Sequence, residues 1–175
     1  MLELYYDDKR IMMTSGMNYL VDSKITESYF FSKYFPIWGW ATWKRAWNLY
    51  DSTMHEWGNE KGERYLDYYY HDMGISQFVG SMLDLVYNNQ VNTWDLQWIY
   101  SCIFNNALCI IPRTNLITNI GYDGTHTAKK RSRSVGIMKK PLNLKQINKP
   151  LLVRQYVEQD KLIFDRILDR DLGGK

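Results

Sequence analysis

The stretch TWDLQWIYSCI, residues 93–103, together with LCIIP at residues 108–112, decides the predicted fold class. Thr93 suits the N-cap of a helix. The apolar residues after it recur at the spacing of one helical face; they are Trp98, Ile99, Cys102 and Ile103. Residues 108–111 form a short apolar run that stops at Pro112, which is typical of a buried strand. A helix followed directly by a buried strand indicates an α/β fold.

The rest of the chain mixes strands and helices in the same way. Short apolar runs predict strands, and longer stretches with apolar residues at helical spacing predict helices. We expect strands at residues 11–14, 29–34 and 115–120, helices at residues 41–50 and 59–90 (split near Gly74), and a closing helix from near Pro150. Residues 2–10 resemble the end of an amphipathic helix. This order predicts an α/β protein with a mixed sheet flanked by helices.

Composition adds an excess of aromatic residues to an otherwise ordinary globular chain. The 175 residues suffice for one domain with a hydrophobic core, and they include 7 Trp and 14 Tyr. A large aromatic core explains part of this excess. Sugar-binding sites also favour Trp and Tyr, because a flat ring covers the C–H face of a pyranose while its OH or NH reaches a hydroxyl.

Charge and cysteine content argue against several classes of function. The net charge is +3, and the basic excess gathers at residues 129–133. Such a run is usually a solvated loop, with phosphates or an anionic membrane surface as alternative partners. No nucleic-acid motif accompanies it, so we expect no nucleic-acid partner. Cys102 and Cys109 indicate reduced core thiols of a cytoplasmic protein. No stretch has the pattern of a signal peptide or of a membrane span.

Three tryptophans surround a glycine in FPIWGWATW, residues 35–43. Pro36 and Gly39 predict a stiff turn with a bare backbone at the start of a helix. Glycine lets a ligand approach the main chain, and a helix N-terminus favours an anion such as a diphosphate. Trp38, Gly39 and Trp40 are therefore candidate binding residues. An aromatic-packed structural turn explains the pattern equally well.

Asp95 is a candidate catalytic residue, with Trp94 and Trp98 as candidate binding residues beside it. An Asp in the first turn commonly does no more than stabilise the helix dipole. Asp95, however, lies three residues before Trp98 and so belongs to the predicted inward face. A carboxylate on that face needs a partner or a chemical role.

His126 is the one histidine in a polar, turn-rich setting, within residues 119–127 and near Asp123. A lone histidine is more often an ordinary surface or core residue than a ligand. That ordinary interpretation is retained for His55 and His71.

Taken together, these blocks resemble a known family. They are residues 8–16, 38–47, 94–98, 111–121 and 125–127, and they lie within residues 1–130, whereas residues 131–175 carry little of the pattern. In this order and spacing the chain resembles bacterial glycosyltransferase family 2-like proteins of the nucleotide-diphospho-sugar transferase superfamily, which have the GT-A fold.

The resemblance implies a function and roles for individual residues. It implies inverting transfer from a nucleotide-sugar donor to a glycan acceptor in surface polysaccharide synthesis. By motif position, Asp95 would be the catalytic base and Gly39 part of the glycine loop by the donor. The tryptophans Trp38, Trp40, Trp94 and Trp98 would contact donor or acceptor. His126 would complete the site of a divalent metal, Mn²⁺ or Mg²⁺.

The chain departs from the family pattern at its start. Family members carry a nucleotide-binding half with an Asp-x-Asp motif before the segment that begins here, and no such motif precedes Ile11. The pair Asp169 and Asp171 lies at the opposite end. We therefore expect a C-terminal half of a GT-A domain at residues 1–135, followed by a basic linker and helix at residues 136–175. A missing half would expose apolar surface, so a homo-oligomer is expected, and the basic run allows peripheral association with the inner face of a membrane.

Two other classes of function stay open. A non-catalytic carbohydrate-binding or assembly module would use the same aromatic residues but would not require an inward Asp95. A basic phosphate- or nucleic-acid-binding domain rests only on residues 129–133 and predicts a steep dependence of binding on salt.

Overall fold

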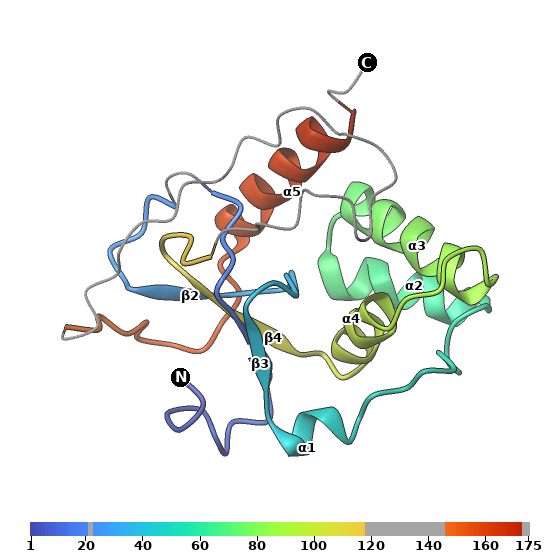
Figure 1. Ribbon diagram of the computed structural model, residues 1–175. Coiled ribbons are helices and arrows are strands. Elements are labelled where there is room, and N and C mark those ends of the chain that lie inside the picture. The colour runs from blue at the N-terminus through green and yellow to red at the C-terminus, as the bar shows by residue number, and fades with distance from the viewer. Residues whose placement is uncertain (21–22, 118–145, 173–175) are drawn as a thin grey trace, which may run out of the picture. The chain divides into compact units, whose positions relative to one another are not determined.

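The computed structural model describes residues 1–20, 23–117 and 146–172. Within these residues the chain forms four strands and five helices (Figure 1). In chain order they are β1 (Ile11–Ser15), β2 (Tyr29–Ser32), β3 (Trp40–Thr42), α1 (Lys44–Trp47), α2 (Glu60–Tyr70), α3 (Met73–Tyr87), α4 (Asp95–Phe104), β4 (Leu108–Pro112) and α5 (Val157–Leu172).

The four strands form one sheet in the order β2-β4-β1-β3. Every residue of β2 and β4 is buried, and in β1 only Thr14 is half-buried. A strand buried along its whole length has a continuous apolar sequence instead of an alternating one. This explains why YFFS and LCIIP form strands. The prediction of an α/β protein with a mixed sheet and helices is confirmed.

Two compact units make up the chain, and neither is a continuous stretch. Unit 1 comprises residues 1–14, 33–35 and 41–109, and unit 2 comprises residues 15–32, 36–40 and 110–175. The chain therefore passes between the units at five points. The boundary expected at residue 135 lies outside the described residues.

Unit 1 gathers helices α2, α3 and α4, which pack against one another (Figure 1). Helix α3 begins at a side-chain cap, because the Asp72 carboxylate accepts a hydrogen bond from the backbone N–H of Ile75 at 3.1 Å. Trp98 of α4 is fully buried, and its indole N–H donates to the sulfur of Met13 in β1 at 3.3 Å. This contact anchors α4 on a central strand of the sheet.

The prediction of a helix end at residues 2–10 is wrong, because the structure has turns there. Arg45 explains the difference. Its guanidinium donates to four backbone carbonyls at 2.7–3.1 Å, and a helix would have used such groups internally. The acceptors are the carbonyls of Tyr5, Tyr6, Asp8 and Ile11.

The helix predicted at residues 41–50 is reduced to α1, because residues 40–42 form β3. The Thr42 hydroxyl donates to the backbone carbonyl of Met12 in β1 at 2.6 Å, so this segment pairs with the sheet before the helix begins. Tertiary contacts therefore override the local helical preference of the segment.

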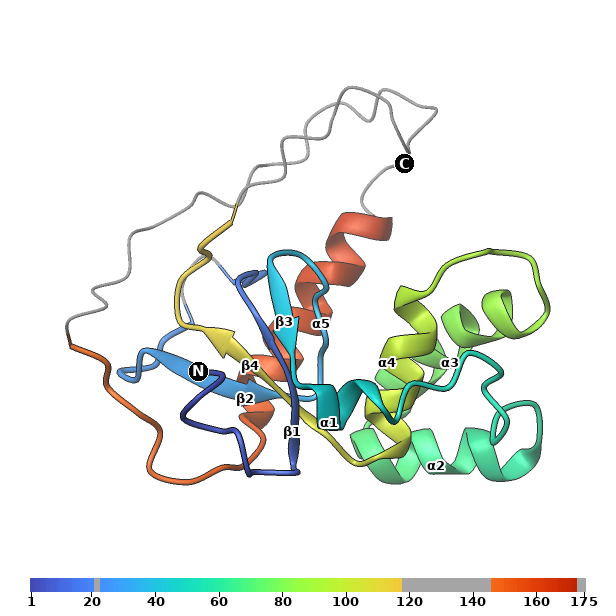
Figure 2. The same ribbon diagram turned by 60° about the horizontal axis from the view of Figure 1, so that its bottom comes forward.

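In unit 2, α5 lies beside β2 (Figure 2). The buried carboxylate of Asp160 accepts from the Ser32 hydroxyl at 2.5 Å and from the Gln155 side-chain amide at 2.8 Å. Gln155 forms a parallel bridge with Phe31, and the N–H of Tyr156 donates to the carbonyl of Phe31 at 2.9 Å. The closing helix begins at Val157 and not near Pro150, because the preceding residues first pair with β2.

The strand predicted at residues 115–120 is not present over residues 115–117, and residues 118–120 lie outside the described part of the chain. The buried side chain of Asn18 holds this mostly half-buried segment in place instead. Its side-chain N–H₂ donates to the carbonyls of Pro112 and Arg113 at 2.7 and 3.0 Å, and its backbone N–H donates to the Asn115 side chain at 3.2 Å.

Candidate functional site

Asp95 is the first residue of α4, in the first turn as the sequence predicts. One carboxylate oxygen, Oδ1, accepts a hydrogen bond from the Leu96 N–H at 2.8 Å and another from the Thr93 hydroxyl. No described residue donates to the other oxygen, Oδ2. Asp95 is half-exposed, so it lies at the margin of the apolar face and not within it as predicted. Trp94, and not Thr93, occupies the N-cap position, and no side chain caps the helix there.

The two tryptophans beside Asp95 have different environments. Trp94 is 45% exposed, whereas Trp98 is fully buried and offers no ring surface to a ligand. Trp47 joins them, with ring centroids 6.5 Å from Trp94 and 5.1 Å from Trp98. Tyr50 stacks on Trp47 at 4.8 Å. Trp98 thus supports, from within the core, an aromatic surface formed by Trp47 and Trp94.

The glycine turn lies in unit 2. Gly39 has φ of +59°, a left-handed conformation that favours glycine, and its carbonyl accepts from the Gly16 N–H at 2.8 Å. A Cβ at Gly39 would lie 2.6 Å from the Cγ2 of Ile117. Gly39 itself is exposed, and Trp38 and Trp40 on either side are half-buried. The turn therefore requires glycine for its conformation and for the close approach of Ile117.

The candidate residues thus form two groups. Trp94, Asp95 and Trp98 lie together on α4 in unit 1, and Trp38, Gly39 and Trp40 lie together in unit 2. His126 lies outside the described residues. Over residues 1–20, 23–117 and 146–172, no three His, Cys, Asp or Glu side chains are grouped so that they could hold a metal ion.

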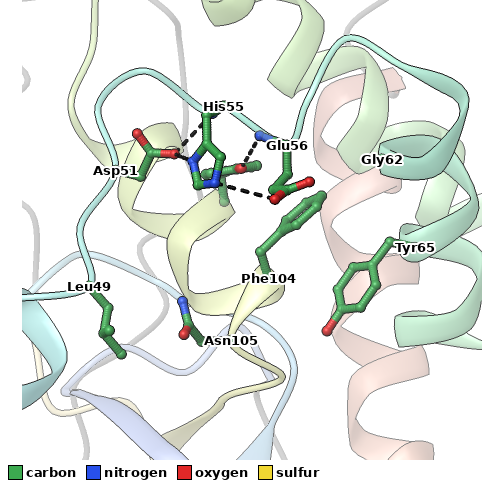
Figure 3. A pocket seen from close by; sticks show the side chains of 9 residues that line it. Leu49, Asp51, His55, Glu56, Gly62, Tyr65, Phe104 and Asn105 are labelled. Atoms are coloured by element: carbon green, nitrogen blue, oxygen red, sulfur yellow. Dashed lines mark hydrogen bonds and ion pairs between the residues drawn. The ribbon is translucent and has the colours of Figure 1, made fainter.

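The structure adds a pocket of about 430 Å³ in unit 1 that the sequence analysis missed (Figure 3). On its polar side the His55 ring lies between two carboxylates, with Nδ1 2.5 Å from Asp51 and Nε2 3.3 Å from Glu56. On its aromatic side Phe104 lies 4.8 Å from Tyr65, centroid to centroid. The lining residues are Leu49, Asp51, His55, Glu56, Gly62, Tyr65, Tyr100, Phe104 and Asn105.

Hydrogen bonds in this pocket shift the pKa values of His55 and Asp51 in opposite directions. The hydrogen bond with Asp51 raises the pKa of the His55 imidazole above its usual value. Burial opposes ionisation of Asp51, but hydrogen bonds from Thr53 and His55 outweigh it and hold the pKa of that carboxyl well below its usual range. Burial raises the pKa of Tyr100 to about 12, so its hydroxyl stays protonated while it accepts from the Glu56 N–H at 3.0 Å.

A signal for this pocket was present in the sequence. Asp51 and His55 are four residues apart and Glu56 follows directly, which places a histidine among carboxylates. The sequence carried no such signal for the aromatic side of the pocket, because Tyr65 lies in α2 and Phe104 in α4, far apart in the sequence.

Comparison with protein-family models, with curated proteins and with solved structures found no match. Of the helices in the described part of the chain, none has the length and apolar character needed to cross a membrane.

Proposed function

We propose that this chain is the acceptor-side part of an inverting GT-A glycosyltransferase, which transfers a sugar from a nucleotide-sugar to a hydroxyl of a bacterial surface glycan. The observation that carries the proposal is the placement of Asp95. Its carboxylate is fixed at the start of α4 by Thr93 and Leu96, while Oδ2 accepts from no described residue. The exposed ring of Trp94 lies next to it in the chain. The motif blocks around residues 38–47 and 94–98 supply the class of enzyme by resemblance.

Asp95 is suited to act as a general base in this reaction. As the acceptor oxygen attacks the anomeric carbon, its proton passes to the Asp95 carboxylate. The bond between the anomeric carbon and the diphosphate oxygen breaks, and its electron pair leaves with the nucleoside diphosphate. The half-exposed position of Asp95 gives a sugar hydroxyl access to this carboxylate.

The family resemblance also implies a divalent metal. The described residues do not fit one, because they contain no group of three suitable ligands and His126 lies outside them. No step of the reaction is therefore assigned to a metal held by these residues.

The experiment that tests the proposal replaces Asp95 by Asn in the full-length protein. The amide keeps the shape of the side chain and removes its basicity, so transfer should fall by a factor on the order of 100 or more, since general-base catalysis contributes about 10²–10⁴-fold. Asp72→Asn is the matched control, because Asp72 also lies at a helix start in unit 1 and accepts from a backbone N–H. It should keep wild-type transfer.

Transfer rate and melting temperature are measured on both variants. Near wild-type transfer per folded molecule in Asp95→Asn would remove the catalytic assignment. Equal losses in both variants would show that the effect comes from the helix start and not from a base.

A second candidate function, non-catalytic carbohydrate binding, is favoured by the pocket of Asp51, His55, Tyr65 and Phe104. Carboxylates beside aromatic rings suit the hydroxyls and C–H face of a sugar. In that case Tyr65→Ala should abolish binding of neutral oligosaccharides in calorimetry, whereas Asp95→Asn should leave it intact. If the protein is a transferase, Asp95→Asn should strongly reduce turnover, whether or not a sugar binds in this pocket.

A further inference from the structure

Two consecutive leucines in unit 2 have large exposed side chains. Leu151 is 94% exposed and Leu152 is 59% exposed. They are consecutive and follow Pro150, which restricts the backbone before them. Contiguous exposed apolar surface is a feature of sites that bind proteins or membranes.

The segment that carries these leucines is fixed at both ends. On one side, the Asn148 carbonyl accepts from the Ser28 N–H at 2.7 Å and the Asn148 N–H donates to the Ser28 hydroxyl at 3.0 Å. On the other side, Gln155 and Tyr156 pair with Phe31 of β2. Figure 2 shows the segment as an open stretch of chain that leads into α5. The leucines are therefore presented by an anchored loop.

Two cationic residues flank the leucines, Lys149 on one side and Arg154 on the other, and both are exposed. No acidic residue lies between residues 147 and 157. After the loop, the Asp160 carboxylate accepts from the Gln155 side-chain amide at 2.8 Å, and Glu158 lies in the first turn of α5. The Glu27 carboxylate accepts from the Tyr156 hydroxyl at 2.9 Å. The tip of the loop thus combines apolar side chains with local positive charge.

We infer that the loop at residues 147–154 docks on an anionic lipid surface, with Leu151 and Leu152 inserted among the acyl chains and Lys149 and Arg154 at the headgroups. The charge of the loop complements anionic headgroups. Two leucines are too small an area for a stable protein interface, which buries about 1,200–2,000 Å², whereas a bilayer accepts isolated apolar side chains. The inference is independent of the proposed transferase activity.

The test measures co-flotation of the full chain with vesicles of phosphatidylglycerol and phosphatidylcholine, against phosphatidylcholine alone. The wild-type chain should bind the anionic vesicles. The double variant Leu151→Ser/Leu152→Ser should bind about tenfold or more weakly, because it loses two insertable side chains. Lys149→Gln/Arg154→Gln should lose roughly fivefold per side chain, and the loss should diminish at high salt.

Met73→Ser is the matched control, because Met73 is also a largely exposed apolar residue, at 69% exposure, but lies at the start of α3 in unit 1. Its binding should equal that of the wild type. A second measurement places an environment-sensitive dye on Leu151→Cys, which is selective because Cys102 and Cys109 are buried. The dye emission should shift to the blue with anionic vesicles.

Unchanged flotation of the double leucine variant, or an equal loss in Met73→Ser, would overturn the inference. An unshifted dye in the presence of anionic vesicles would overturn it as well. A change in molar mass on replacing the leucines, without a change in vesicle binding, would assign the loop to self-association instead.

Discussion

Replacing Gly39 by Ala tests whether the turn between Trp38 and Trp40 depends on glycine. The φ of +59° costs a residue with a Cβ roughly 1–2 kcal/mol. The new Cβ would also lie 2.6 Å from the Cγ2 methyl group of Ile117, so the isoleucine side chain would have to shift within its packed surroundings. Overpacking of that kind costs about 1–3 kcal/mol. The free energy of unfolding should therefore fall by about 2–5 kcal/mol.

A second substitution separates the two contributions. Ile117→Ala removes the clashing methyl group but not the backbone strain. In this background Gly39→Ala should cost only the roughly 1–2 kcal/mol of the left-handed conformation. The double-mutant cycle should give a coupling of about 1–3 kcal/mol between the two positions.

Gly80→Ala provides the control, since Gly80 lies inside α3 and its nearest neighbour would be the Cδ1 of Leu66 at 3.5 Å, an ordinary contact. Alanine should stabilise the helix there by roughly 0.5–1 kcal/mol. Urea unfolding followed by tryptophan fluorescence and circular dichroism gives the unfolding free energies of the wild type and of the four variants. A Gly39→Ala loss below about 1 kcal/mol, or no coupling to Ile117, would refute the account of the turn.

Further predictions concern the ion pair, the core and the α5 contact. The pKa of His55, raised by Asp51, should lie above 6.5 in an NMR titration and fall in Asp51→Asn. The raised pKa stabilises the folded protein fully at pH values below the pKa of His55 in the unfolded chain, and this stabilisation is lost as the pH rises through its pKa in the folded protein. The melting temperature of the wild type should therefore exceed that of His55→Gln at about pH 6 but not at about pH 9. Trp98→Ala should cost about 3–5 kcal/mol in urea unfolding, because the ring is fully buried; a loss below about 1 kcal/mol would contradict its role as core support. Asp160→Ala should cost about 1–3 kcal/mol, because the buried hydroxyl of Ser32 loses its acceptor, and an unchanged melting curve would exclude that contact.

The strands that are buried along their length, such as β1 and β4, were the most predictable part of the fold. Residues 11–14 and 108–111 are continuous apolar runs because these strands are buried along their length, and that signal is local in the sequence. The start of α4 was predicted to within one residue, from Thr93 as the expected N-cap, because the apolar stripe after it has helical spacing.

The remaining features depend on contacts between distant residues. Residues 41–50 have helical character, but Thr42 bonds to Met12 and Arg45 bonds to the first turns of the chain, so β3 replaces the first part of the helix. The late start of α5 depends likewise on pairing of Gln155 with Phe31. No local pattern encodes these contacts, because their partners lie 30 or more residues away.

The candidate site likewise combines features that neighbouring residues determine with features that depend on distant contacts. The position of Asp95 was readable from its neighbours, but its half-exposure was not, because the Thr93 and Leu96 donors hold it at the margin of the apolar face. The pocket around His55 needs Tyr65 and Phe104 from separate helices, and only folding brings them together.

The hydrogen bond between Ser32 and Asp160 can form only late in the synthesis of the chain by the ribosome. The two residues are 128 positions apart, so at roughly 5–20 residues per second about 6–26 s separate their appearance. In that interval the apolar strand Tyr29–Ser32, fully buried in the finished protein, lacks the helix that lies beside it. The residues of unit 1 are complete by residue 109, well before those of unit 2. Exposed strands of this kind aggregate or are bound by chaperones, so slowing translation anywhere between residues 33 and 160 should lower the expression yield.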